Sequence, residues 1–291
     1  MPTPLTHPAL LGHPRVRRAS PITRHCLGAA LEALGTTEHP SPRIGVITCV
    51  LAGCVNYSRR FCDEMLRDPA SASPLVFPET VFNAPASHLA ACLGTTAENC
   101  TLVGDEGMFA QGLALASDWL LRGKADAVLV VGADELDWLV GGAMSLFDPG
   151  LIHAAGAGAV CLRRAAVFGP VVALEAVTDA VSFTRRESRA SAAQRVRAQL
   201  PAGAVEELLV SSSRGCARLD AAEDATWADW PGRRLHPQRM LGVAFAAGAA
   251  WQVVVACEAL RRGAAQAANV AITGTNQQAV GVRFRAGLDT A

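Results

Sequence analysis

The sequence lacks an excess of charge of either sign, has few charged residues, and contains a single lysine. Its 291 residues include 26 basic and 26 acidic side chains, and only 18% of residues are charged. Every basic side chain except Lys124 is an arginine, and the arginines are spread along the chain. Nucleic-acid binding needs a net positive field or a basic stripe, so the composition argues against that class. Because 51% of residues are hydrophobic, it also argues against disorder.

The opening segment does not predict a signal peptide, and no apolar run predicts a convincing membrane span. Three arginines lie in the first 20 residues, but no continuous apolar stretch follows them, so this segment is not a signal peptide. We therefore expect a cytoplasmic protein. The one long apolar run, Leu241–Leu260, contains Gln252 and Glu258 and consists largely of alanine and glycine. This composition is typical of a helix buried in a soluble core and too weakly hydrophobic for a membrane span.

Paired cysteines are absent. The chain has nine cysteines, an odd number, and no Cys-x-x-Cys spacing. A disulfide framework or a zinc knuckle is therefore not expected, and nothing in the sequence predicts a metal or a cofactor. Most of the cysteines lie in apolar strings, which predicts small buried side chains.

Apolar runs and glycine stops predict helices that alternate with strands. Helices are expected over Pro21–Leu34, Ser58–Arg67, Ala84–Leu93, Gly107–Leu121 and Met240–Leu260. Strands are expected over Arg43–Leu51, Cys100–Val103, Ala127–Val131, Ala159–Leu162, Val171–Val177, Leu208–Ser211 and Asn269–Thr273. The segment Trp227–Arg234 is interpreted as an exposed loop.

Two of these helices are apolar on almost every side. Gly107–Leu121 and Met240–Leu260 must therefore lie inside the molecule, between layers. Each is followed by an Arg-Gly stop and a buried strand, and a shift of 140 residues superposes Arg122–Ala125 on Arg262–Ala265. This repeat predicts two halves of one topology, each giving a core helix to a shared centre.

Several strings, in this order and spacing, resemble the β-ketoacyl-acyl-carrier-protein synthases. They are Phe77–His88 (FPETVFNAPASH), Leu121–Glu135 (LRGKADAVLVVGADE), Gly156–Leu162 (GAGAVCL), the stretch from Gly242 to Gly248 before a long helix, and Gly274-Thr275-Asn276. The resemblance implies a thiolase-like layered α/β fold (α-β-α-β-α) with buried central helices. Its two pseudo-duplicated halves would comprise residues 1–165 and 166–291 of one compact unit.

The resemblance also locates the positions of the catalytic residues. A ketosynthase needs a cysteine at the turn that opens the first buried helix, two histidines, and a lysine that supports the second histidine. Counting from the flanking motifs places Glu106 at the cysteine, Ser212 at the first histidine, Gln238 at the lysine and Val243 at the second histidine. None of the seven histidines occupies these positions. The sequence therefore predicts a site that no longer catalyses the condensation reaction of a ketosynthase.

Subunits without a catalytic site are found in this superfamily. The chain resembles the chain-length factors of type II polyketide systems, which pair with an active ketosynthase and shape the acyl tunnel, and more narrowly the ketosynthase-like partners of aryl-polyene pathways. The resemblance implies an active ketosynthase as partner and an acyl carrier protein met only indirectly. Glu106 would fill the oxyanion hole from within, since free N–H groups at a helix start favour a carboxylate. Met108 and Phe109 are the candidates for lining the tunnel or the interface.

Other functions remain open at this point. The chain could be an independent malonyl decarboxylase or acyltransferase that uses Glu106 or a displaced cysteine, Cys54 or Cys100. An ionised glutamate would repel a malonyl carboxylate, however, and no histidine remains to stabilise an enolate. A hydrolase triad of a serine from Ser211–Ser213 with Asp220 and His236 lacks the G-x-S-x-G context. A homodimeric acyl-binding scaffold is the third alternative.

Overall fold

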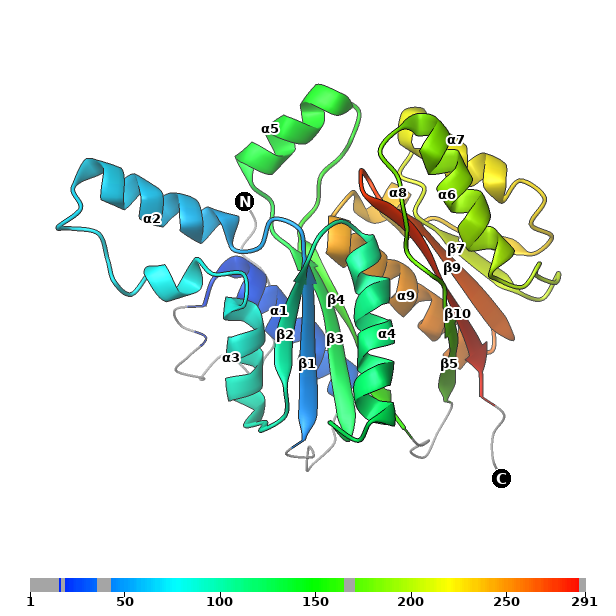
Figure 1. The fold of residues 1–291 in the computed structure, drawn as a ribbon, viewed down its shortest axis with the longest axis horizontal. Coiled ribbons are helices and arrows are strands. Elements are labelled where there is room, and N and C mark those ends of the chain that lie inside the picture. Colours follow the sequence, from blue (N-terminus) through cyan, green and yellow to red (C-terminus); the bar gives the residue numbers. More distant parts are fainter. Residues whose placement is uncertain (1–15, 17–18, 36–42, 165–170, 288–291) are drawn as a thin grey trace.

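The computed structural model describes residues 16, 19–35, 43–164 and 171–287, which form two β-sheets with helices between and outside them (Figure 1). One sheet has the strand order β2-β1-β3-β4. The other has the order β5-β10-β9-β7-β8, with β6 beside β10. The predicted boundary between the halves, at residue 165, and most of the arginine-containing opening lie outside the described residues.

The first sheet contains three parallel strands and one antiparallel strand. It consists of β1 (Ile44–Val50), β2 (Asn99–Val103), β3 (Ala127–Asp134) and β4 (Gly156–Arg163), and β4 runs antiparallel to β3. Every residue of β1 and β3 is buried because helices cover both faces, which explains their nearly unbroken apolar runs. The outer cover is α1 (Pro21–Leu34) and α3 (Ala84–Leu93), whose bounds agree with the prediction.

The second sheet is built in the same manner from the C-terminal part of the chain. Its strands are β5 (Val172–Val177), β6 (Val181–Ser182), β7 (Leu208–Ser211), β8 (Arg233–Leu235), β9 (Ala267–Thr273) and β10 (Gln278–Ala286). β7 lies parallel to β8 and β9, whereas β10 is antiparallel to β9 and β5. Helices α6 (Arg186–Ala198) and α7 (Ala217–Thr226) form the outer layer on this side (Figure 1).

The two apolar helices lie between the sheets, as predicted. α4 (Gly107–Leu121) and α9 (Phe245–Arg261) share one hydrophobic core with strands of both sheets. Small residues permit the close packing: a Cβ on Gly132 of β3 would lie 2.3 Å from the carbonyl oxygen of Ala246 in α9. The strands that follow these helices begin at Ala127 and Ala267, which preserves the shift of 140 residues.

Two predictions about the C-terminal half were wrong. The second core helix does not begin at Met240, because a separate short helix, α8 (Pro237–Leu241), ends at Gly242, whose φ of 88° breaks the run. The segment between α7 and β8 is a loop, and Ala228, Asp229 and Pro231 are exposed, but its two tryptophans, Trp227 and Trp230, are not. Both indoles are buried, with 2% and 5% of their surface exposed, and pack edge to face under α6.

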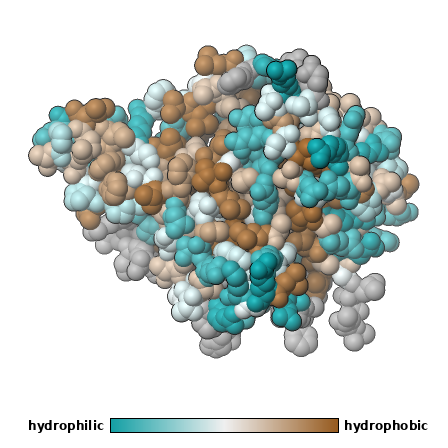
Figure 2. Space-filling view, in the orientation of Figure 1, coloured by the Kyte–Doolittle hydropathy of each residue, from teal (hydrophilic) through white to brown (hydrophobic). Residues whose placement is uncertain are grey.

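The first sheet carries a projecting arm at its upper left in Figure 1. The arm consists of α2 (Val55–Arg67), which begins three residues before the predicted start, and the short helix η2 (Phe77–Glu79). No residue of α2 is buried, and Figure 2 shows apolar side chains on the arm. A second helix, α5 (Trp138–Phe147), projects beside it, and the Arg59 guanidinium lies 5.1 Å from the Trp138 ring.

Among the described helices, none combines the length and apolar character needed to cross a bilayer.

A buried carboxylate connects three core elements. Asp134, at the end of β3, accepts hydrogen bonds from the amides of Leu51 and Ala52 after β1 and of Ala246 in α9. Only 1% of its surface is exposed. Burial raises the pKa of Asp134 to about 7, although the three amide donors oppose the shift. The side chain therefore takes up a proton on folding at mildly acidic pH.

This proton uptake predicts a pH dependence of stability. The folded-state pKa lies above the ordinary value of 3.8, so the free energy of unfolding falls as pH rises from about 4 to about 7. Asp134→Asn removes this contribution. Urea denaturation at pH 5 and at pH 7.5 should show the wild type losing more stability than the variant between the two values. Equal losses would refute the assignment.

Candidate functional site

The turn between β2 and α4 presents Glu106, which motif spacing predicts to stand at the position of a ketosynthase nucleophile. Glu106 is the N-cap of α4, and its side chain is fully buried. Its carboxylate forms an ion pair with Arg214, at 2.8 Å from Oε1 to Nη2, and the Arg214 side chain is only 1% exposed. Thr275 donates twice, from its backbone N–H at 2.8 Å and from its hydroxyl at 2.6 Å. The position is thus held by a closed set of protein partners.

The electrostatics of this pair favour two full charges. Burial alone would raise the pKa of Glu106, but the Arg214 charge and the Thr275 hydrogen bonds outweigh it, so the pKa lies below its ordinary value. Burial likewise opposes the Arg214 charge, and Glu106 more than offsets that effect and raises the pKa of Arg214. Arg214 also donates to the carbonyl of Thr273 at 2.9 Å. The result is an ionised pair sealed in the interior.

The neighbouring Asp105 fixes the turn to the second half of the chain. Its carboxylate accepts from the amides of Gln277 at 2.9 Å and Gln278 at 3.2 Å. Gly274 is needed here, since a Cβ would come within 2.1 Å of Asp105 Oδ2. Burial, and then the charge of Glu106, raise the pKa of Asp105 to about 6. The turn before α4 and the turn after β9 therefore form one polar junction.

The partners of Glu106 differ from those that the sequence suggests. The three hydrogen bonds to its carboxylate come from Arg214 and Thr275, both in the C-terminal half, and none of them from the amides of α4. A guanidinium supplies a full positive charge, whereas a helix start supplies about half of one. The carboxylate consequently points across the junction.

The structure brings Ser212 close to this junction. Its hydroxyl donates to Glu223 at 2.5 Å and accepts from the amide of Thr273 at 3.0 Å. Burial raises the pKa of Glu223. Ser212 and Arg214 thus both bond to the backbone of Thr273 at the end of β9. The Ser212 hydroxyl is fully engaged in these structural hydrogen bonds with Thr273 and Glu223.

Gln238 and Val243 lie around the start of α9. The Gln238 amide nitrogen is 3.3 Å from Gln252 Oε1, and its own side-chain oxygen is buried without a described partner. The backbone of Val243 bonds to Ile152 and Ala154 on either side of His153. The Val243 side chain is buried in a small apolar cluster with Leu151 and Cys216. Neither side chain is a proton donor for a reacting group.

Sequence reasoning missed Arg214 and Thr275 as partners of Glu106, although Thr275 lies in one of the strings that carry the resemblance. Arg214 lies 108 residues from Glu106 in the chain, and only the fold brings them together. One feature of the sequence could have indicated the partner of Arg214. This arginine closely follows a predicted buried strand, Leu208–Ser211, and a buried arginine needs an acidic partner. The sequence does not specify which acidic residue fills that role.

The other proposed nucleophiles are poorly placed. Burial raises the pKa of Cys54 to about 12, and burial also raises that of Cys100, which lies within β2. The Ser211 hydroxyl is 2.6 Å from His236 Nδ1, but Asp220 binds Ser213 and the amides that follow it. No thiolate, and no serine with a His–Asp pair, is therefore assembled by these residues.

Of the two tunnel candidates, Phe109 is fully buried in the core shared by both sheets. Met108 is half-buried in the first turn of α4, where its side chain fills the space beside Gly104.

Comparison with solved structures identifies the architecture. No protein-family model and no curated protein matches the sequence. The ishigamide ketosynthase/chain length factor superposes with a TM-score of 0.77 over 96% of this chain and 84% of its own, at 20% identity. A β-ketoacyl synthase from Burkholderia phymatum STM815 gives a TM-score of 0.76 over 98% and 86% of the two chains, at 15% identity.

The chain has the ketosynthase fold. A chain of a third structure, AntDE:AntF, a type II polyketide synthase acyl-carrier protein in complex with its ketosynthase, superposes with a TM-score of 0.77 at 12% identity. It covers 96% of this chain and 88% of its own. The expected thiolase-like layers are confirmed. Within this ketosynthase fold, the junction of Glu106, Arg214 and Thr275 stands at the head of the first core helix.

Proposed function

We propose that the chain is a non-catalytic ketosynthase-like subunit that pairs with an active ketosynthase and shapes its acyl tunnel. The pathway would be polyketide or fatty-acid-like, with aryl polyenes as the narrower candidate. The observation that carries the proposal is the buried ion pair of Glu106 and Arg214. A carboxylate with no exposed surface and a guanidinium partner neither attacks a thioester nor receives an acyl group as a thiolate does.

The surface of the first sheet supports a pairing role. β2 is an edge strand, hydrogen-bonded on one side to β1. At its end Val103 is 49% exposed. The α2–η2 arm adds exposed apolar side chains at Leu66 and Phe77, and Phe82 follows shortly after η2. Monomers seldom display this combination, because an open strand edge and apolar side chains invite association. Under the proposal a second subunit covers this face.

Co-expression with the ketosynthase encoded nearest to its gene tests the proposal. We expect the two chains to co-purify, and intact-mass measurement to show acyl groups from a carrier thioester only on the partner. The chain alone should neither gain an acyl group nor consume malonyl thioester. Acylation or malonyl consumption by the isolated chain would instead support the independent enzyme. A stable homodimer that ignores the ketosynthase would support the acyl-binding scaffold.

A further inference from the structure

Two buried carboxylates follow the central strand β3, near the start of both projecting helices. Glu135 and Asp137 have only 5% and 2% of their surfaces exposed. Glu135 Oε1 accepts from the amide of Asn56 at 2.8 Å, and Asp137 Oδ1 accepts from the amides of Leu139 and Val140. The other two oxygens, Glu135 Oε2 and Asp137 Oδ2, are buried and have no hydrogen-bond partner in the described part of the chain. Each carboxylate therefore keeps one oxygen free in the interior.

The two carboxylates lie on the same side of the chain. The backbone at Asp137 is extended, with φ −131° and ψ 147°, and side chains two residues apart in an extended chain point the same way. Burial, and also the negative charge of Asp137, raise the pKa of Glu135, although Asn56 and, less strongly, the Ile22 amide oppose the shift. Among the described groups that act most on Glu135, none is a basic side chain. Two like charges thus lie close together, stabilised by amides.

The position of this pair in the first sheet is one at which α/β proteins bind ligands. Asn56 follows β1, and Glu135 follows β3, which lies parallel to β1 and beside it. In the order β2-β1-β3, the chain passes from β1 to one neighbour and later to the other, so the strand order reverses at β1. Ligands of open α/β sheets bind outside the carboxyl ends of the strands at such a point. The fold and the free oxygens therefore indicate the same place.

A cation at this place would connect the two projecting helices, α2 and α5 (Figure 1). Asn56 lies in the first turn of α2, and Asp137 is the N-cap of α5. Neither helix has a buried side chain among those whose exposure is described. A contact between them is the one of the Arg59 guanidinium with the Trp138 ring. Because elements with little packing are held weakly, the positions of both helices depend on their first turns.

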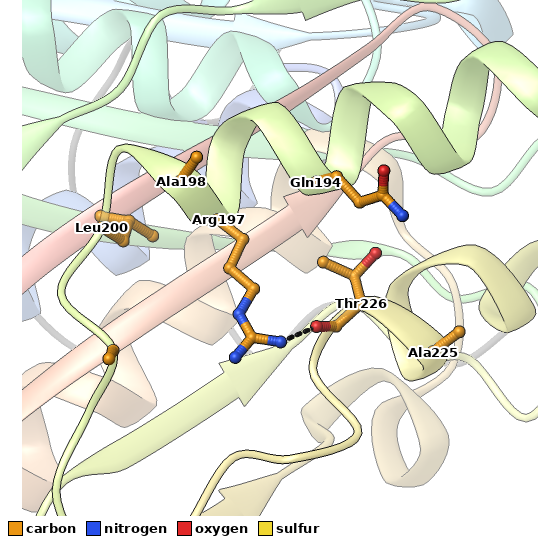
Figure 3. Close-up of a pocket in the computed structure, with 7 residues that line it drawn as sticks. Gln194, Arg197, Ala198, Leu200, Ala225 and Thr226 are labelled. Carbon is orange, nitrogen blue, oxygen red and sulfur yellow. Dashed lines mark hydrogen bonds between the residues drawn. The ribbon is translucent and has the colours of Figure 1, made fainter.

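A hollow between α6 and α7 shows the contrasting case of a charged group that already has its partner (Figure 3). There Arg197 points to the carbonyl of Thr226 and also pairs with Asp229. Its guanidinium lies 5.3 Å from the Trp227 ring. Because the guanidinium and the carboxylate compensate each other, this hollow gives no reason to expect an ionic ligand.

We propose that Glu135 Oε2 and Asp137 Oδ2 bind a hard divalent cation, calcium or magnesium, which fixes the first turns of α2 and α5. Carboxylate oxygens are ligands that these ions prefer, and a double positive charge neutralises both carboxylates. The Leu136 carbonyl between them accepts from the Asn56 side chain at 3.2 Å and has a second lone pair. Water would supply the other ligands, since the described residues contain no group of three acidic, histidine or cysteine side chains suited to a metal. So few protein ligands imply a dissociation constant of about 0.1–1 mM.

Thermal unfolding of the full chain tests the site, and the test does not depend on the pairing proposed above. After EDTA treatment and dialysis, calcium or magnesium at about 10 mM should raise the unfolding midpoint by at least about 3 °C, and the rise should saturate. Sodium chloride of equal ionic strength should not reproduce it. The ion with the larger shift at equal concentration is the preferred cation. Amide hydrogen exchange, followed by mass spectrometry, should slow in α2 and α5 when that ion is added.

Variants separate this site from general effects of divalent salt. E135Q/D137N keeps the oxygens that face the amides but removes both charges, so the midpoint shift and the slower exchange should disappear. The matched control is D118N/E258Q, which removes two partly exposed carboxylates at the ends of α4 and α9 and should respond as the wild type does. A wild type that ignores both ions, or equal shifts in the two double variants, would overturn the proposal. Higher stability of E135Q/D137N without metal, in a chain that ignores both ions, would assign a shared proton to the pair instead.

Discussion

Glu106→Gln should lower the free energy of unfolding by about 3–5 kcal/mol, measured by urea denaturation at neutral pH. The substitution keeps the size of the side chain but removes the charge that faces Arg214. The guanidinium would then remain buried without its ion-pair partner, with the Thr273 carbonyl as a hydrogen-bond acceptor and only the more distant carboxylates of Glu223 and Asp220 as opposite charges. A buried cation that has lost its direct partner costs several kcal/mol, because protein dipoles replace water incompletely.

A double-variant cycle separates the pair from the rest of the junction. E106Q/R214M removes both charges of the pair and should recover a large part of the stability lost in E106Q alone, since the buried guanidinium that has lost its partner is gone as well. Glu98→Gln is the surface control: Glu98 pairs with Lys124 at 3.2 Å, but both side chains are about half exposed. Its effect should stay below about 1 kcal/mol. If E106Q fell within that range, the ion pair would not be a major element of stability.

Phe109→Ala should also cost about 3–5 kcal/mol, because the ring is fully buried in the core between the sheets. The loss combines the transfer of a phenyl group to water with the cavity that it leaves. Leu121→Ala on the same helix is the control. Leu121 is 76% exposed, so its stability change should stay within about 0.5 kcal/mol.

The same variant tests whether Phe109 sets the depth of the acyl tunnel. If the ring borders the tunnel in the paired complex, the enlarged space should lengthen the product of the partner ketosynthase, as measured by mass spectrometry. An assembled complex of the variant that gives unchanged products would restrict Phe109 to packing. Met108→Ala offers an independent probe at a half-buried position next in the chain.

Much of the fold could be predicted because its information is local. The bounds of α1, α3 and α4 follow from apolar periodicity and from the breaks that end it, such as Gly35 and Gly94 with their positive φ. The repeat of the two core helices can be recognised in the sequence because both helices need small residues for close packing. These patterns occupy short windows of sequence, where periodicity is a sufficient guide.

The sequence predicts where the candidate site lies along the chain, but it does not predict which residues contact Glu106. Motif spacing led to Glu106 at the head of α4, whereas its partners lie 108 and 169 residues away. No local pattern encodes such pairs. The burial of Trp227 and Trp230 was missed for the same reason: a polar, proline-containing string indicates a loop, and only distant residues of α6 and the second sheet bury the two indoles.

The close pairing of Glu106 with Arg214 limits which single substitutions at these two positions a chain with this fold can accept without losing stability. A thiol at position 106 would face a buried guanidinium instead of a proton acceptor, and replacing Arg214 alone would leave a buried carboxylate. Each single substitution toward a nucleophile therefore passes through a less stable intermediate, and only a concerted exchange avoids it. A substitution of either residue lowers the stability of the fold as long as the other is unchanged, so each residue of the pair restricts substitution of the other.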